Sequence, residues 1–205
     1  KDHAEGSWPS GIEIMKRVFK REPPIPYIYE FFLVDNEKMS ASKGNVYIVQ
    51  DVLKVMEPEH FAYFYTKKPG KQRDLSFKDL GLIREYENAE KIYFGAAKAD
   101  NAREEKNIKR SYEMATQKIP ACLPKRIPFD FAAQLVQIYS RNEDVIEAMK
   151  SSGHITTEFS DDDMKSARQR LDLARNWIAM FAPEEVKIKV SESVSPDVKA
   201  KLSDA

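Results

Sequence analysis

Cysteine is nearly absent from this sequence. The 205 residues include a single cysteine, Cys122, which excludes an internal disulfide and a zinc site built from paired cysteines, and suits a reducing cytosol. Charge of one sign is also missing, because 33 Lys and Arg residues balance 33 Asp and Glu residues. A net charge of zero excludes a histone-like basic protein, so any nucleic-acid contact has to come from a local cluster of cations.

Long hydrophobic runs are missing too. The longest apolar stretch, residues 27–34, is interrupted by Glu30 and is far shorter than the roughly 20 residues that span a bilayer. We therefore expect no membrane segment. The sequence opens Lys1-Asp2-His3, without an initiator methionine or an apolar signal segment, so we expect a piece of a longer, cytoplasmic protein.

The first quarter of the sequence carries both helix and strand patterns. Apolar residues recur at helical spacing over residues 12–19, and Pro23-Pro24 blocks further helix. Residues 27–34 form a near-continuous apolar and aromatic run, which is typical of a strand covered on both faces. Asp35-Asn36 then supplies a turn, and residues 37–45 are predicted to be a loop. A helix followed by a buried strand is half of an α/β crossover.

The rest of the sequence is helical in pattern. Proline and glycine separate segments with helical spacing of apolar residues, at residues 51–56, 59–65, 77–94, 96–117, 129–149 and 160–181. Ser160 is predicted to cap the last of these helices. We therefore predict a mainly α protein with a partial α/β (Rossmann-type) segment at the N-terminus.

One loop carries the clearest chemistry, with the sequence Lys38-Met39-Ser40-Ala41-Ser42-Lys43-Gly44-Asn45. It follows a predicted buried strand, and ligands of open α/β sheets bind at the carboxyl ends of strands. Its two ammonium groups could neutralise charge that grows on a leaving pyrophosphate, and its hydroxyls and backbone add donors. By composition alone, a solvated surface turn is an equally good interpretation.

This octapeptide closely resembles the KMSKS signature of class I aminoacyl-tRNA synthetases, in the extended form that ends in Lys-Gly-Asn. The resemblance implies that the loop holds the phosphates of ATP while an amino-acid carboxylate displaces pyrophosphate. Lys38 and Lys43 would be the catalytic residues. The loop residues implied in ATP binding are Met39, Ser40, Ser42, Lys43 and Gly44. Ala41 stands where the signature has a lysine, and Lys43 is expected to make that phosphate contact.

Segments outside the loop resemble class I lysyl-tRNA synthetase, the archaeal type. They are Lys1-Asp2-His3 and residues 25–32, 61–73 and 85–90. The resemblance implies that Asp2 and His3 bind ATP, with the Asp2 carboxylate accepting two ribose hydroxyls; a polar chain end without a role is the alternative for both. It also implies lysine, tRNA and ATP with Mg²⁺ as partners, although no metal site is visible in the sequence. A glutamyl-type synthetase, which has a related fold, is the second interpretation.

The resemblance also suggests a division of the chain. Residues 1–50 would be the C-terminal part of the catalytic domain, 51–126 a helical stem-contact region, 127–190 a partial helical anticodon-binding domain and 191–205 a mobile tail. The His-Ile-Gly-His type element that the family carries in the N-terminal catalytic half is absent from the sequence. We therefore expect the 205-residue chain alone to be inactive.

Four cations without an intervening acid surround a Pro-Gly turn signal, and they are Lys67, Lys68, Lys71 and Arg73. They are predicted to form an exposed basic loop that contacts the phosphates of tRNA. A solvated loop without a ligand is the alternative. A second, mixed run at residues 106–110 is less specific.

Three further side chains are predicted to have ordinary roles. His60 and His154 have no spaced Cys or His partners, so they are interpreted as partly exposed side chains rather than metal ligands. Trp177 is predicted to pack in the core. The rival function for the whole chain is a non-catalytic tRNA-binding helical module that keeps the loop at residues 38–45 as a structural turn.

Overall fold

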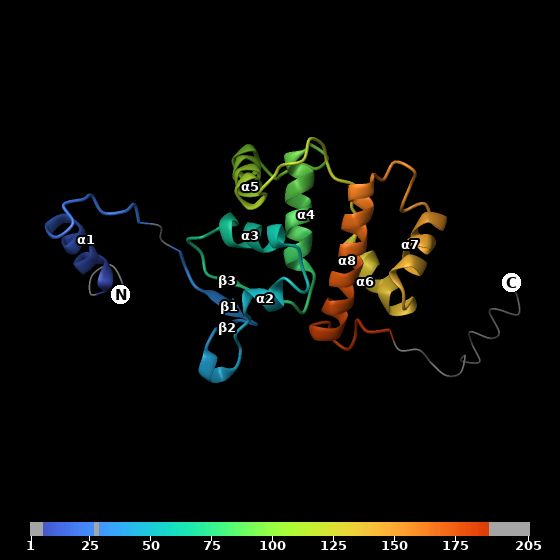
Figure 1. The fold of residues 1–205 in the computed structure, drawn as a ribbon, viewed down its shortest axis with the longest axis horizontal. Helices are drawn as coiled ribbons and strands as arrows, with labels where there is room; N and C mark the ends of the chain where they lie inside the picture. Colours follow the sequence, from blue (N-terminus) through green and yellow to red (C-terminus); the bar gives the residue numbers. More distant parts are fainter. Residues whose placement is uncertain (1–5, 27–28, 189–205) are drawn as a thin grey trace, which may run out of the picture.

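A computed structural model describes residues 6–26 and 29–188. Asp2, His3 and the tail from residue 191 lie outside the described residues, so the predictions made for them stay predictions. The described part is mainly helical, as predicted, with one small sheet (Figure 1). No helix in this part combines the length and apolar character needed to cross a membrane.

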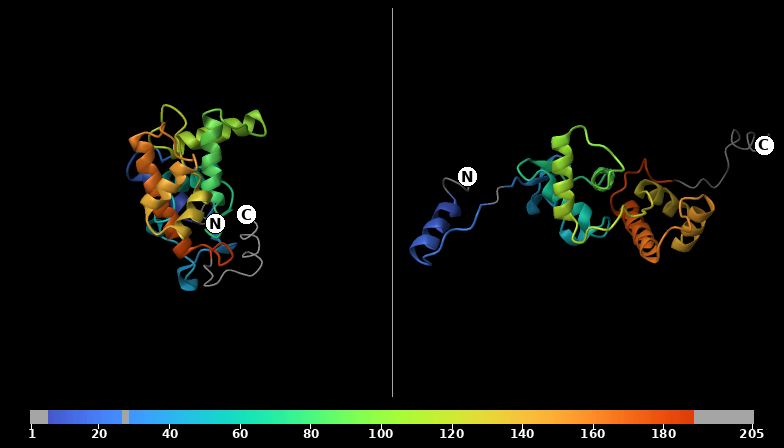
Figure 2. Two further views of the ribbon diagram at one scale, coloured as in Figure 1. Left: turned by 90° about the vertical axis from the view of Figure 1, so that its right-hand side faces the viewer. Right: turned by 90° about the horizontal axis from the view of Figure 1, so that it is seen from above.

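The first helix, α1 (Ser7–Arg17), forms close to where the spacing of apolar residues predicts it, but none of its residues is buried. It stands away from the body of the molecule in Figures 1 and 2. Val18 and Phe19, which follow it, are also largely exposed. The apolar surface of this segment is therefore not covered by the described residues.

The sheet is built around β1 (Phe32–Val34). It pairs antiparallel with β2 (Glu37–Lys38) and parallel with β3 (Arg73–Asp74). The predicted turn joins β1 and β2 at Asp35-Asn36, where both residues have positive φ, 51° and 63°, a region that Asp and Asn tolerate better than most residues.

A strand covered on both faces is predicted over residues 27–34. Residues 27–28 lie outside the described residues, and for residues 29–34 the prediction is wrong. Each neighbouring strand offers two residues for pairing, so the ladder includes only residues 32–34. Tyr29 is 59% exposed and Phe31 is 48% exposed, and within the strand only Val34 is buried. A two-faced α/β sheet is therefore absent from the described residues.

Three helices form one half of the body. After the short α2 (Val49–Val52), α3 (Pro58–Lys67), α4 (Gly81–Tyr93) and α5 (Ala102–Ala115) pack together. Their shared core contains the buried side chains Tyr63, Tyr86, Ala89, Ile92, Ile108, Tyr112 and Ala115.

Helix α4 begins four residues later than the predicted helix over residues 77–94. The carbonyl of Phe77 accepts a hydrogen bond from Trp177 Nε1 at 2.8 Å. This carbonyl is therefore bonded to another part of the protein rather than within a helix, and α4 begins after it. This contact also confirms that Trp177 packs in the core. Gly95 ends α4 with φ +77°, as its position predicts.

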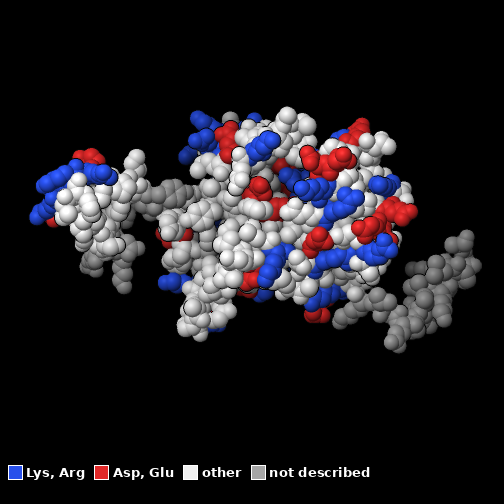
Figure 3. Space-filling model, viewed as in Figure 1, with Lys and Arg blue, Asp and Glu red and all other residues white. Residues whose placement is uncertain are grey.

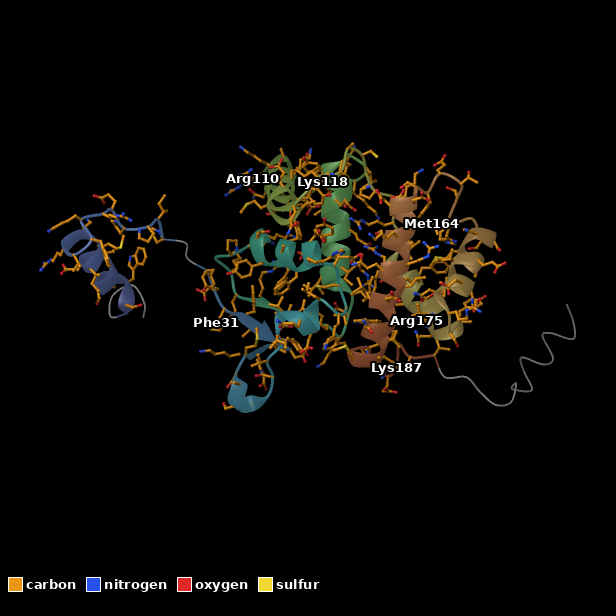
Figure 4. All side chains as sticks on the ribbon, viewed as in Figure 1. Phe31, Arg110, Lys118, Met164, Arg175 and Lys187 are labelled. Atoms are coloured by element: carbon orange, nitrogen blue, oxygen red, sulfur yellow. The ribbon has the colours of Figure 1, made fainter. Side chains whose placement is uncertain are left out.

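The other half of the body contains α6 (Phe129–Ile138), α7 (Asn142–Ser151) and α8 (Asp161–Met180). The prediction of one helix over residues 129–149 is wrong, because the chain turns between α6 and α7. Arg175 on α8, labelled in Figure 4, donates to the carbonyls of Val136 and Tyr139 and to Asn142 Oδ1. This tertiary contact satisfies carbonyls that a continuous helix would have bonded internally.

Helix α8 begins as predicted at Ser160. The Ser160 hydroxyl accepts from the backbone amide of Asp163, while the Asp163 carboxylate accepts from the backbone amide of Ser160, which is a capping box. The helix presents Ala167, Leu171 and Ala174 to the core.

A buried cluster of charged side chains connects the two halves. We call Glu57, His60, Glu87 and Arg170 the Arg170 cluster. Arg170, 1% exposed, donates through Nε and Nη2 to Glu57 Oε1 at 3.1 and 3.0 Å, and through Nη1 to Glu87. Its Nη1 also donates to the carbonyl of Ile127 at 2.9 Å. One side chain of α8 thereby contacts α4, the N-terminus of α3 and the segment before α6.

The prediction that His60 is partly exposed is wrong. Its ring is buried, lies 4.4 Å from the ring of Tyr86 and places Nδ1 3.3 Å from Glu57 Oε2. Burial lowers the pKa of His60 to about 3, although Glu57 acts in the opposite direction. Burial alone would raise the pKa of Glu57, but His60 and Arg170 outweigh it and hold that pKa at about 2. Because His60 is neutral at pH 7, Arg170 is the charge that stabilises the Glu57 carboxylate there.

Candidate functional site

The loop predicted to carry the chemistry is closed by its own hydrogen bonds. We call residues 38–45 the lysine loop. The Ser40 amide donates to Asn45 Oδ1 at 2.8 Å, and Asn45 Nδ2 donates to the carbonyl of Lys38 at 3.2 Å. Between them, η1 (Ala41–Lys43) makes one 3₁₀ turn, which ends at Gly44 with φ +70°. A side chain at Gly44 would strain this backbone, so the glycine fixes the end of the turn.

The side chains of the lysine loop have weak partners. Lys43 Nζ lies 3.2 Å from Glu37 Oε2, and both side chains are more than 60% exposed. Lys38 Nζ lies 4.9 Å from the centroid of the Phe31 ring. The hydroxyls of Ser40 and Ser42 are 2.9 Å apart. Exposed ion pairs contribute about 0–1 kcal/mol, so both ammonium groups can exchange their present partners for a phosphate.

The lysine loop projects from the body below the sheet in Figure 1. No residue from 38 to 45 is buried, so its donors are available to a ligand. The structure thus brings Lys38, Ser40, Ser42, Lys43 and Gly44 together on one loop, and Met39 lies among them. Their roles toward ATP stay predictions. The described residues contain no group of three or more His, Cys, Asp or Glu side chains placed to hold a metal ion.

The predicted basic loop is only half available. Lys67 Nζ pairs with Glu85 Oε1, and Arg73 Nη2 lies 2.8 Å from Glu85 Oε2. Arg73 also donates to the carbonyl of Phe64 and stacks its guanidinium 4.0 Å from the Phe64 ring centroid. The prediction of an exposed loop is therefore wrong for Lys67 and Arg73.

The acid that pairs with Lys67 and Arg73 reaches the loop through tertiary packing. Glu85 lies on α4, 18 residues after Lys67 in the sequence, and only the packing of α3 on α4 brings it to the loop. Lys68 and Lys71 are exposed, as predicted. They are the two cations of this loop that remain available to a ligand.

Sequence reasoning also missed buried charge inside the resembling segment at residues 85–90. Glu90 is 3% exposed and accepts from Arg126 Nε at 2.8 Å and from Tyr112 Oη at 3.0 Å. The sequence does indicate this burial, because Glu90 lies on the apolar stripe of α4, where a carboxylate requires a charged or hydrogen-bonding partner.

Comparison with known proteins bears on the whole chain. The family described as tRNA synthetases class I (K) matches residues 1–118. A protein of Thermococcus kodakarensis named lysine--tRNA ligase is 38% identical over 200 residues, which cover 94% of this chain and 38% of that protein. Proteins of the same name from Pyrococcus horikoshii and Methanocaldococcus jannaschii are 36% and 31% identical, and each match covers the whole of this chain and 41% of the relative.

These matches differ in how much of each protein they cover. The chain spans between 38% and 41% of the length of these three relatives. The family match, in contrast, covers more than half of the chain and includes α1, the sheet, the lysine loop and α2 to α5. The chain therefore belongs to the family of class I (K) tRNA synthetases.

Proposed function

We propose that this chain is part of a lysine–tRNA ligase, which activates lysine with ATP to lysyl-adenylate and then transfers lysine to tRNA. The observation that carries the proposal is the lysine loop, where two exposed ammonium groups, paired hydroxyls and a fixed glycine turn form a phosphate-binding arrangement. Membership of the class I (K) family and the name lysine--tRNA ligase of its relatives support it.

In the first step, a carboxylate oxygen of lysine attacks the α-phosphorus of ATP and the bond to pyrophosphate breaks. Negative charge then grows on the leaving pyrophosphate, and Lys38 and Lys43 neutralise it. To do so, Lys43 leaves Glu37, which costs little because the pair is exposed. Mg²⁺ bound to the phosphates of ATP would share this charge neutralisation. Asp2 and His3 would bind the nucleotide at its ribose.

In the second step, a hydroxyl of the terminal adenosine of tRNA attacks the carbonyl carbon of the adenylate, and AMP leaves. We assign residues 51–126 to the contact with the tRNA stem and residues 127–190 to a partial anticodon-binding domain. These assignments accord with the two helical halves, α3 to α5 and α6 to α8.

Residues 1–50 would be the C-terminal part of the catalytic domain, and we propose that the 205-residue chain alone is inactive. The exposed apolar surface of this region supports the proposal, since Ile25 is 94% exposed and Phe19 60% exposed. Surfaces of this kind are usually covered by other parts of a protein. In a longer protein, the remainder of a catalytic domain would cover the exposed apolar surface of residues 1–50.

The test is lysine-dependent exchange of pyrophosphate into ATP, measured on the complete protein that contains this chain. Lys38→Ala and Lys43→Ala are each expected to slow exchange roughly 10²–10³-fold, as loss of one transition-state donor does. Lys165→Ala, which removes an exposed lysine of α8, is the matched control and should exchange normally.

Each other outcome identifies a different error. Unchanged exchange in both loop variants would refute the assigned mechanism and favour a non-catalytic tRNA-binding module. Exchange that depends on glutamate rather than lysine would identify a glutamyl-type enzyme. Robust exchange by the 205-residue chain alone would overturn the proposal that it is inactive.

A further inference from the structure

Helix α5 has three chemically distinct faces. One face is buried through Ile108, Ser111, Tyr112 and Ala115. A second face is self-neutralised, because Lys109 pairs with Glu105 at 2.6 Å. A third face points away from the core and carries Arg103, Lys106 and Arg110, which are spaced by three and four residues and are all exposed. That spacing aligns side chains on one side of a helix.

The third face has charge that the protein itself does not neutralise. Arg103 and Lys106 form no ion pair with another described residue, and Arg110 pairs only with Glu113, at 3.2 Å, while its side chain is 74% exposed. Such a pair contributes little and is easily exchanged. The stretch from Arg103 to Arg110 extends about 10 Å along the helix axis, from a rise of about 1.5 Å per residue.

A groove continues this row toward the predicted basic loop. It lies between the C-terminus of α3 and the start of α5 and has a volume of about 250 Å³. Its lining includes three cations, Lys67, Lys68 and Arg103, with the acid Glu104 and the amides Asn101 and Asn107. Lys68 is exposed, unlike Lys67. Lys and Arg atoms gather over α5 in Figure 3, and Figure 4 labels Arg110 on this helix. We call Lys68, Arg103, Lys106 and Arg110 the α5 row.

We propose that the α5 row binds backbone phosphates of a helical RNA segment. The choice of RNA rests on the function proposed above, whereas the choice of phosphate rests on the row itself. Long, exposed cations in a line, whose one ion pair is the weak contact of Arg110 with Glu113, are suited to a line of phosphates. A protein partner would need buried apolar or aromatic anchors, and the only exposed large apolar side chain of α5 is Met114.

Counterion release predicts how steeply the RNA affinity should fall with salt concentration. Each neutralised phosphate of a duplex contributes about −0.9 to the slope of log K against log salt, so four contacts predict a slope of about −3.6. Between 50 and 200 mM salt the affinity would fall about 150-fold. Removing three of the four cations should leave a slope near −0.9 and a fall of only about 3.5-fold.

The experiment measures binding of a 12-base-pair RNA hairpin to the 205-residue chain by fluorescence anisotropy at several salt concentrations. The test variant is Arg103→Ala/Lys106→Ala/Arg110→Ala. The matched control, Lys150→Ala/Lys165→Ala/Arg168→Ala, removes the same charge from exposed sites on α7 and α8. Circular dichroism is used to check that both variants retain their helices.

We expect the test variant to lose about 2.7 of the slope and the control to match the unchanged chain. Equal slopes in the test and control variants would overturn the α5 row as the binding surface. Equal affinity for a 12-base-pair DNA duplex would overturn the commitment to RNA and identify a general polyanion surface. Pyrophosphate exchange needs no RNA and tests the ligase proposal, whereas hairpin binding tests the α5 row, so failure of the one is distinguishable from failure of the other.

Discussion

The Arg170 cluster leads to the sharpest prediction about stability. Arg170→Met replaces the guanidinium by an apolar side chain of similar length. It leaves the carboxylates of Glu57 and Glu87 and the carbonyl of Ile127 without the donor that bonds all three. A largely buried acid that loses its partner is destabilised, because the remaining exposure of Glu57 (11%) and Glu87 (19%) replaces little of the lost interaction.

The expected cost follows from that loss. Removing one partner of a buried ion pair costs about 3–5 kcal/mol, a large share of the roughly 5–15 kcal/mol that stabilises a domain. At about 2–4 °C per kcal/mol for a chain of this size, the melting temperature should fall by about 6–20 °C. Adding Glu57→Gln and Glu87→Gln to Arg170→Met removes the stranded charges and should recover part of the loss.

The assay is urea unfolding followed by far-ultraviolet circular dichroism. Arg168→Met is the matched control, because it makes the same change two residues earlier on the exposed side of α8, and it should shift the free energy of unfolding by less than about 0.5 kcal/mol. The reasoning is refuted if Arg170→Met lies within that range of the control, or if the triple variant is less stable than Arg170→Met alone.

Two further predictions concern pH and a helix end. The folded state holds the pKa of His60 at about 3 and that of Glu57 at about 2, so the unfolded chain takes up protons first as the pH falls. Between about pH 6.5 and 4.5, His60 should lower the free energy of unfolding by up to about 1.4 kcal/mol per pH unit, and below about pH 4.5 Glu57 should add to that slope. Urea unfolding at pH 7, 5.5 and 4.5 measures this fall, and an equally steep fall in His60→Leu would contradict the assignment to His60. Ser160→Ala removes the N-cap of α8 and should lower the free energy of unfolding by about 1 kcal/mol. Ser166→Ala, within the same helix, is the control. Equal urea midpoints for the two variants would show that the cap contributes nothing.

Local signals predicted the fold where the cause of structure is local. The turn at Asp35-Asn36, the cap at Ser160 and the stop at Gly95 each depend on residues adjacent in sequence. Two helices predicted too long, over residues 77–94 and 129–149, are shortened by distant contacts. Arg175 ends α6 from 36 residues away, and Trp177 bonds the carbonyl of Phe77 from 100 residues away.

The candidate site likewise has one part that adjacent residues determine and another that depends on distant residues. The lysine loop could be located from eight consecutive residues, because the hydrogen bonds that close it lie within residues 38–45. Its role toward ATP stays a prediction, and the contacts of Lys43 with Glu37 and of Lys38 with Phe31 lie outside the motif. The pairing of the basic loop could not be predicted, since the acid that neutralises Lys67 and Arg73 comes from another helix. The α5 row joins Lys68 to residues more than 30 positions later, so a run of charges along the sequence did not reveal it.

The two tryptophans of the chain lie in contrasting places. Trp8 belongs to α1, which buries none of its residues, whereas Trp177 is enclosed in the body and bonded to Phe77. Their emission spectra should therefore differ, with Trp8 red-shifted and quenchable and Trp177 blue-shifted and protected. A single fluorescence measurement can then distinguish an event at the N-terminal helix from melting of the body, without any added label.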